Sequence, residues 1–112
     1  MEITFKTKRL QKICSTAAIA QKELGKEMAA KLMQRLTQLH AANHLGEISH
    51  LPPARCHVLT GNRKGQISVD LKHPFRLLFV PLHDPIPVKG DGGYDLEKIT
   101  TIEIVAIEDT HV

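Results

Sequence analysis

The sequence predicts an α+β fold in which two N-terminal helices pack on a small, mainly antiparallel sheet in the order β-α-α-β-β-β-β. Three observations predict it. The 112 residues suit one domain, 1–112. An apolar fraction of 42% is enough for a packed core. A helical period fills the first part of the chain and a strand period follows residue 54, which is typical of helices on one side of an antiparallel sheet.

The N-terminal part contains a short strand and then helices. Residues 2–6 alternate between polar and apolar side chains, so we expect a strand there. From Lys8 the apolar period is helical as far as Gly25, which is a plausible helix stop. Ser15 and Thr16 allow a restart, so either one helix or two short helices fit this segment.

A further helix is predicted over residues 26–42. It carries one apolar stripe, which comprises Met28, Leu32, Leu36 and Leu39. The polar residues that fall outside this stripe are Lys31, Gln34, Arg35 and Gln38. A stripe of this kind is typical of core packing, and a seat for a partner helix is the alternative.

The remaining elements are loops and strands. Residues 43–54 contain Asn, Gly and Pro signals and predict a connecting loop. The strand period predicts four strands, over residues 55–59, 66–71, 75–80 and 100–107. Residues 83–98 carry three Pro/Gly signals and predict a long loop, and such loops are usually functional or mobile.

Charge is distributed unevenly along the chain. Residues 1–76 hold 13 Lys/Arg against 5 Asp/Glu, a balance of +8, and residues 77–112 hold 2 against 7, a balance of −5. The two balances sum to the net charge of +3. A basic body suits a polyanion such as RNA, and the alternative is that these side chains solvate helix faces.

No targeting signal is apparent. The first residues lack a basic segment followed by an apolar run, and no stretch approaches the roughly 18 apolar residues that span a bilayer. Cys14 and Cys56 form no C-x-x-C pair and are interpreted as small buried hydrophobic residues in a reducing compartment, although one disulfide between them is the alternative. We therefore expect a cytoplasmic protein with no membrane association.

The predicted hairpin over residues 55–71 offers candidates for RNA binding. Arg55 and His57 are two residues apart and would share a strand face. The turn that follows presents Arg63 and Lys64 between glycines, and two cations there suit a phosphate chain. An ordinary hairpin with a solvated, charged tip is the alternative interpretation.

Arg76 and the histidines are the other candidates. Arg76 begins an apolar run, where a charge is costly unless it is paired or at the strand end, so we interpret it as a rim residue or an anion ligand. His111 near the C-terminus is either a solvated tail residue or a functional one. His40 and His44 lack a third ligand and make a weak metal site, so we expect no metal and no cofactor.

A resemblance covers nearly the whole chain. Residues 51–71 resemble the central hairpin of the RelE/HigB toxin superfamily, closest to the plasmid-maintenance killer (HigB-like) proteins of type II toxin–antitoxin systems. The segments that continue it in order are His73-Pro74-Phe75-Arg76-Leu77-Leu78-Phe79, Asp91-Gly92-Gly93-Tyr94-Asp95 and Ile107-Glu108-Asp109-Thr110-His111. The resemblance implies a RelE-like fold.

It also implies an activity. Members of this superfamily are ribosome-dependent mRNA endoribonucleases (mRNA interferases) that use no metal, and a cognate antitoxin, here a helix-turn-helix HigA-like protein, neutralises them. The 2′-hydroxyl attacks the adjacent phosphate, which requires a base, an acid and cations. By position the acid and base are His57 and His111, Arg76 stabilises the phosphate, and the RNA-binding turn is Arg63 and Lys64.

Two residues depart from the family pattern. Relatives commonly have Lys at the position of Thr60 and Tyr at the position of Thr110. A threonine supplies neither a cation nor an effective acid near neutral pH. Two interpretations therefore stay open: an active endoribonuclease, or a weakened or inactive toxin fold that retains antitoxin or RNA binding. For residues 83–98 the hypothesis is contact with the ribosome or closure over the site. The endoribonuclease hypothesis requires His57, Arg63, Arg76 and His111 to converge on one cationic surface.

Overall fold

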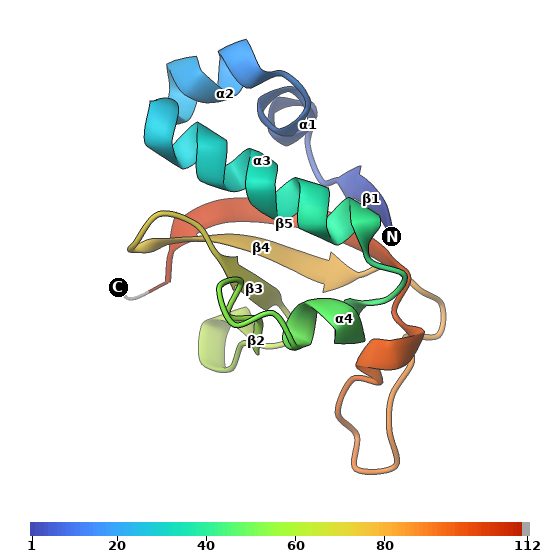
Figure 1. The fold of residues 1–112 in the computed structure, drawn as a ribbon. Helices are drawn as coiled ribbons and strands as arrows, with labels where there is room; N and C mark the ends of the chain where they lie inside the picture. The colour runs from blue at the N-terminus through green and yellow to red at the C-terminus, as the bar shows by residue number, and fades with distance from the viewer. Residues whose placement is uncertain (111–112) are drawn as a thin grey trace.

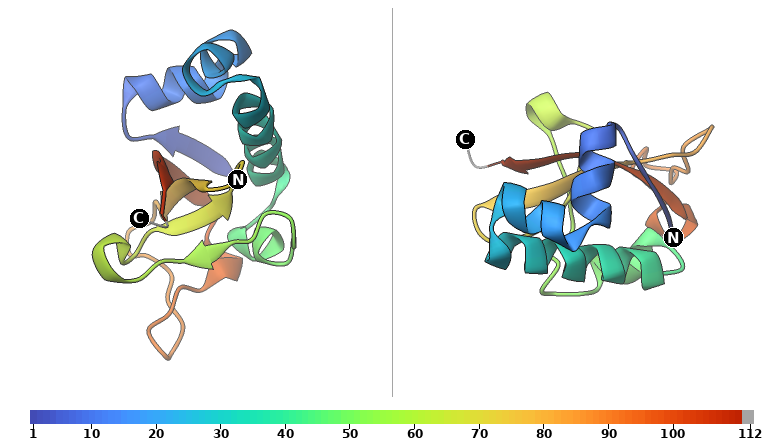
Figure 2. Two further views of the ribbon diagram at one scale, coloured as in Figure 1. Left: turned by 90° about the vertical axis from the view of Figure 1, so that its left-hand side faces the viewer. Right: turned by 90° about the horizontal axis from the view of Figure 1, so that it is seen from above.

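A computed structural model describes residues 1–110. Within them, four α-helices gather on one side of a five-stranded mixed sheet (Figures 1 and 2). The helices are α1 Lys8–Ser15, α2 Ala17–Leu24, α3 Lys26–Ala41 and α4 Leu45–Ser49. The strands are β1 Glu2–Phe5, β2 His57–Val58, β3 Ile67–Asp70, β4 Phe75–Pro81 and β5 Thr101–Asp109. The predicted α+β class is confirmed. None of the described helices is long and apolar enough to cross a bilayer.

The sheet is mainly antiparallel, as predicted. Its strand order is β1-β5-β4-β3-β2, and β1 pairs in parallel with β5 while the other neighbours are antiparallel. The last described strand therefore lies between the first strand and β4, which Figure 1 shows as the red ribbon beside the blue one.

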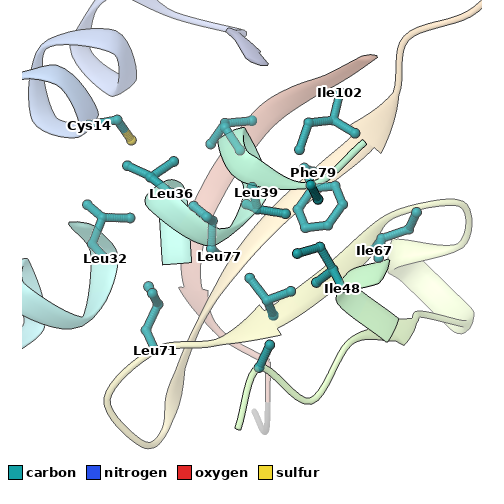
Figure 3. Packing of buried hydrophobic residues seen from close by; sticks show 14 of the residues in the cluster. Cys14, Leu32, Leu36, Leu39, Ile48, Ile67, Leu71, Leu77, Phe79 and Ile102 are labelled. Carbon is teal, nitrogen blue, oxygen red and sulfur yellow. The ribbon is translucent and has the colours of Figure 1, made fainter. Parts of the chain in front are cut away.

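The predicted apolar stripe of α3 is confirmed as core. Its members Met28, Leu32, Leu36 and Leu39 are buried. They pack against sheet residues such as Leu77, Phe79 and Ile102, and Ile48 of α4 closes the same layer (Figure 3). Because this stripe is covered within the chain, it is not available as a seat for a partner helix.

The helical segment 8–24 forms two helices. The Thr7 hydroxyl caps α1 by accepting a hydrogen bond from Leu10 N at 3.1 Å. Thr16 then adopts an extended conformation with φ −131°, which ends α1 and begins α2. Gly25, with φ 84°, separates α2 from α3, because this left-handed region favours glycine.

Four local predictions need correction. Residues 43–54 contain the helix α4, whose Leu45 and Ile48 supply buried side chains. The strand predicted over 55–59 pairs only at β2, because Arg55 has φ 47° and lies outside the ladder. Residues 83–98 contain a β-bridge between Val88 and Tyr94 and a short 3-10 helix, η2 Leu96–Lys98.

Arg35 is the fourth correction, because it is 3% exposed although it lies outside the apolar stripe. Its Nε donates to the Asp70 carbonyl at 2.6 Å and its Nη2 to the Pro53 carbonyl at 2.6 Å, while Nη1 donates to Gln38 Oε1 at 3.1 Å. Desolvation by burial lowers the Arg35 pKa, and the nearby Asp70 charge partly offsets this by raising it. Arg35 thus ties α3 to the start of the β2–β3 region and to the end of β3.

Candidate functional site

The sheet has a second face that points away from the helices. One row of register partners points into the core: Val69, Leu77 and Ile107. Side chains alternate along a strand, so the adjacent row lies on the second face. That row consists of Asp70, Arg76 and Glu108 on three neighbouring strands. Arg76 is therefore placed between two carboxylates at the end of the sheet.

Arg76 is held by groups on β3. Its Nε lies 3.2 Å from Oδ1 of Asp70, within ion-pair distance but without the alignment of a hydrogen bond. Its Nη1 donates to the hydroxyl of Ser68 at 3.4 Å. The Arg76 side chain is only 15% exposed, so these two contacts fix the direction in which its guanidinium points. Arg76 is neither a free rim residue nor an unpaired charge.

Asp70 also pairs with Arg55. Nε of Arg55 lies 3.5 Å from Oδ2 of Asp70, although the Arg55 side chain is 64% exposed. One carboxylate thus faces two guanidinium groups, one exposed and one nearly buried. Asp70 reduces the positive potential at this corner of the second face while it keeps the two arginines close together.

Arg63 and Lys64 lie on and directly after the 3-10 turn η1 Gly61–Arg63. The turn is closed by Lys64 N, which donates to the Gly61 carbonyl, and by Gln66 N, which donates to the Arg63 carbonyl. Nη2 of Arg63 donates to Oε1 of Glu108 on β5 at 2.9 Å, so the turn folds back over the second face. Lys64 is exposed. The predicted basic turn is present, and one of its two cations has an acidic partner.

A hollow of about 320 Å³ lies between this turn and Arg76. The residues that line it are Leu59, Thr60, Asn62, Arg63, Arg76 and Thr110. A second hollow of about 410 Å³ adjoins it, and Asn62 and Arg63 line both. The first hollow is called the Arg63–Arg76 hollow below. It brings together Arg63 and Arg76, two of the three predicted arginines, and both threonines that depart from the family pattern, while Arg55 does not line it.

Of the two predicted histidines, only His57 lies within the described residues. His57 is on β2 in register with Ser68, which puts it on the second face, but it does not line the Arg63–Arg76 hollow. The residues of this segment that line the hollow are Leu59 and Thr60, which follow β2. His111 lies outside the described residues. Its neighbour Thr110 does line the hollow.

Sequence reasoning missed the acidic residues of this site. Asp70 and Glu108 pair with the candidate arginines, and neither was singled out beforehand. Strand alternation predicts that Asp70 lies on the opposite face from Val69. Only the strand register shows that Asp70 lies beside Arg76. Glu108 lies beyond the strand predicted over residues 100–107, whereas β5 continues to Asp109.

The cysteine thiols do not contribute a nucleophile near neutral pH. Burial raises the pKa of Cys14 and of Cys56 from 9.0 to about 11. Both cysteines are free, so the alternative of a disulfide between them is not realised. Among residues 1–110, no group of three or more His, Cys, Asp or Glu side chains is arranged to hold a metal ion.

No protein-family model matches the chain, and no curated protein matches it either.

Proposed function

We propose that the chain is a toxin of a type II toxin–antitoxin system with a RelE-like fold, and that it cuts mRNA on the ribosome in the cytoplasm. The observation that carries this proposal is the Arg63–Arg76 hollow, in which arginines from two elements, η1 and β4, line one open cavity together with Thr60 and Thr110. Two converging cations are suited to an RNA phosphate and to the extra charge that develops on it during cleavage.

The proposed chemistry needs no cofactor. The 2′-oxygen forms a bond to the adjacent phosphorus while the bond from phosphorus to the 5′-oxygen breaks. A base accepts the proton of the 2′-hydroxyl, and an acid returns a proton to the departing 5′-oxygen. Arg76 would stabilise the phosphorane, since Asp70 holds its Nε and the residue lines the hollow. By resemblance, His57 and His111 would transfer the protons, and Arg55, Arg63 and Lys64 would bind the RNA backbone.

The alternative function is a weakened or inactive toxin fold that still binds antitoxin or RNA. Thr60 and Thr110 favour it, because both line the hollow and neither supplies a cation or an acid. The carboxylates favour it too, because an RNA phosphate must compete with Glu108 for Arg63 and with Asp70 for Arg76. Slow cleavage is the expected behaviour if catalysis is retained.

The partners that we propose are mRNA, the ribosome and a cognate antitoxin, a helix-turn-helix protein of the HigA type. The α3 stripe is buried, so the antitoxin must bind another surface. An acidic antitoxin segment laid on the second face would satisfy Arg55, Arg63 and Lys64 and would close the hollow.

Induced expression followed by mapping of mRNA 5′ ends tests the proposal. The expected result is growth arrest with new cleavage sites, both lost in Arg76→Ala and in His111→Ala. Arg9→Ala is the matched control, because Arg9 is an exposed arginine on α1 that pairs with Glu23. Thermal melts must show that the variants fold. Arrest without new mRNA ends, or no arrest at high expression, would favour the binding protein instead of the nuclease.

A further inference from the structure

The hydroxyl of Tyr94 contacts the segment that carries the basic turn. Tyr94 Oη donates a hydrogen bond to the Gly65 carbonyl at 2.6 Å, and the two residues are 29 positions apart in the chain. Gly65 comes directly after Lys64 and two residues after Arg63. The bond is partly buried, so water competes for it less than at an exposed position.

Tyr94 is itself fixed by a hairpin, residues 87–95. Its bridge partner is Val88, and the pair is flanked by Lys89 N donating to the Gly93 carbonyl at 2.7 Å and Asp95 N donating to the Pro87 carbonyl at 3.0 Å. The Tyr94 ring packs against the core. In Figure 1 this hairpin is the orange loop that extends away from the sheet and helices. Tyr94 therefore joins the core, the hairpin and the basic turn.

Gly65 is shaped to accept this contact. Its φ is +90°, a conformation that favours glycine, and a Cβ at this position would lie 3.3 Å from Tyr94 Oη. A residue with a side chain at this position would have a strained backbone, and its Cβ would crowd the Tyr94 hydroxyl. The chain thus brings the Gly65 carbonyl into direct reach of one side chain from a distant loop.

The other contacts of the turn are local or exposed. The hydrogen bonds to the Gly61 and Arg63 carbonyls stay within the turn, and the bond from Leu59 N to the Gln66 carbonyl at 2.8 Å joins the two ends of the same hairpin. The Arg63–Glu108 pair is long-range, but the two side chains are 31% and 48% exposed, and such a pair adds little rigidity in salt solution. The Tyr94 hydrogen bond is thus the long-range contact best suited to keep the turn in one conformation.

We propose that Tyr94 is a positioning residue for RNA binding: its hydroxyl holds the η1 turn in the conformation that presents Arg63 and Lys64 to the RNA backbone. This inference depends on the proposed function for its ligand, single-stranded RNA. Without the hydroxyl the turn samples more conformations, and RNA binding must then order it. The loss of one such hydrogen bond corresponds to an affinity lower by about three- to tenfold.

The test uses Tyr94→Phe, which keeps the ring and removes only the hydroxyl. The affinity for a single-stranded RNA oligonucleotide is measured at one salt concentration in the otherwise unchanged chain and in an Arg63→Ala/Lys64→Ala chain. The proposal expects the affinity loss in the first background and none in the second, because Tyr94 acts through these two cations. Ile86→Ala is the control beside the hairpin, since Ile86 is 40% exposed and is not part of the Val88–Tyr94 bridge, and the RNA affinity of this variant should not change.

Amide hydrogen exchange separates this inference from the proposed function. Without RNA, the Lys64 and Gln66 amides should exchange faster in Tyr94→Phe than in the unchanged chain, while the amides of β4 and β5 stay as they were. Unchanged exchange at Lys64 and Gln66 overturns the inference, whether or not the chain binds RNA. An equal affinity loss in both RNA-binding backgrounds overturns it as well. If the chain without substitutions binds no RNA, the proposed function and the RNA ligand are wrong. The exchange result still decides whether Tyr94 holds the turn.

Discussion

Arg76 and Asp70 face each other across β4 and β3, with Nε of Arg76 3.2 Å from Oδ1 of Asp70. Their side chains are 15% and 24% exposed, which separates this pair from the ordinary ion pairs at the surface of the chain. Asp70 therefore has two roles: it compensates a nearly buried charge, and it holds the Nε side of the Arg76 guanidinium.

Asp70→Asn should lower the free energy of unfolding by about 1–3 kcal/mol, because Arg76 would remain largely buried without its counter-charge. Urea denaturation measures this. Arg9→Gln is the control, since it removes one member of an exposed pair and should change the stability by less than about 0.5 kcal/mol. Equal stability of Asp70→Asn and the unchanged chain would show that the pair does not hold Arg76.

Arg35→Met should be more damaging, with a loss of about 2–4 kcal/mol. The substitution keeps an apolar stem but leaves the Asp70 and Pro53 carbonyls without the donors that they have in the structure. Gln34→Met, one residue earlier on the exposed side of α3, should have little effect on the urea midpoint. If the two variants unfold at the same urea concentration, Arg35 does not tie α3 to β3.

Glu108→Gln should strengthen RNA binding. The change releases Arg63 from its carboxylate and removes one negative charge from the hollow that adjoins the Arg63–Arg76 hollow. We expect an affinity about two- to fivefold higher at low salt, with the gain shrinking as salt rises. Glu103→Gln removes the same charge from the same strand, where its register partner is Val80, and should have a smaller effect. A comparable gain in both variants would mean that only net charge matters.

The two threonines of the hollow can be changed to the residues common in the resembled family. Thr60→Lys with Thr110→Tyr would add a cation and a phenol beside Arg63 and Arg76. If the lack of this cation and this phenol weakens catalysis, the mRNA cleavage rate should rise about 10- to 100-fold in the double variant. Thr37→Lys on the exposed side of α3 is the charge-matched control. No gain in the double variant would count against the proposed positions of acid and cation.

The thiols should react slowly in the native state. With the pKa of Cys14 and Cys56 raised from 9.0 to about 11, the thiolate fraction at pH 8 falls about a hundredfold. The folded state holds these protons more tightly than the unfolded state, so their contribution to stability is complete below pH 9 and is lost as the pH rises toward 11. Iodoacetamide labelling at pH 8, compared with and without urea, measures the difference. Equal labelling rates would contradict it.

The sequence predicted the elements whose residues have a clear period. The α3 stripe and the strands β3, β4 and β5 are of this kind, because burial on one face leaves a repeat that can be read directly. The helix α4 was missed because it is only five residues long and lies among turn signals. Arg35 was misplaced because its burial depends on backbone carbonyls that α3 meets only after folding.

The candidate site was predicted in part. The arginines were chosen by position and by resemblance, and Arg63 and Arg76 do line one hollow. Their partners Asp70 and Glu108 could not be found in the same way, because strand register and the fold-back of the η1 turn decide which charges meet. His57 lies on the expected face, but the residues of its segment that line the hollow are Leu59 and Thr60.

The position of β5 between β1 and β4 has a consequence for protein synthesis. A nascent chain that still lacks residues 101–110 has no β5 to pair with β1 and β4. It also lacks Glu108 and Thr110. Non-local pairing of this kind forms late, after the closing segment has left the exit tunnel. The Arg63–Arg76 hollow would then first exist once residues 101–110 have left the exit tunnel, so a shorter nascent chain does not yet carry it.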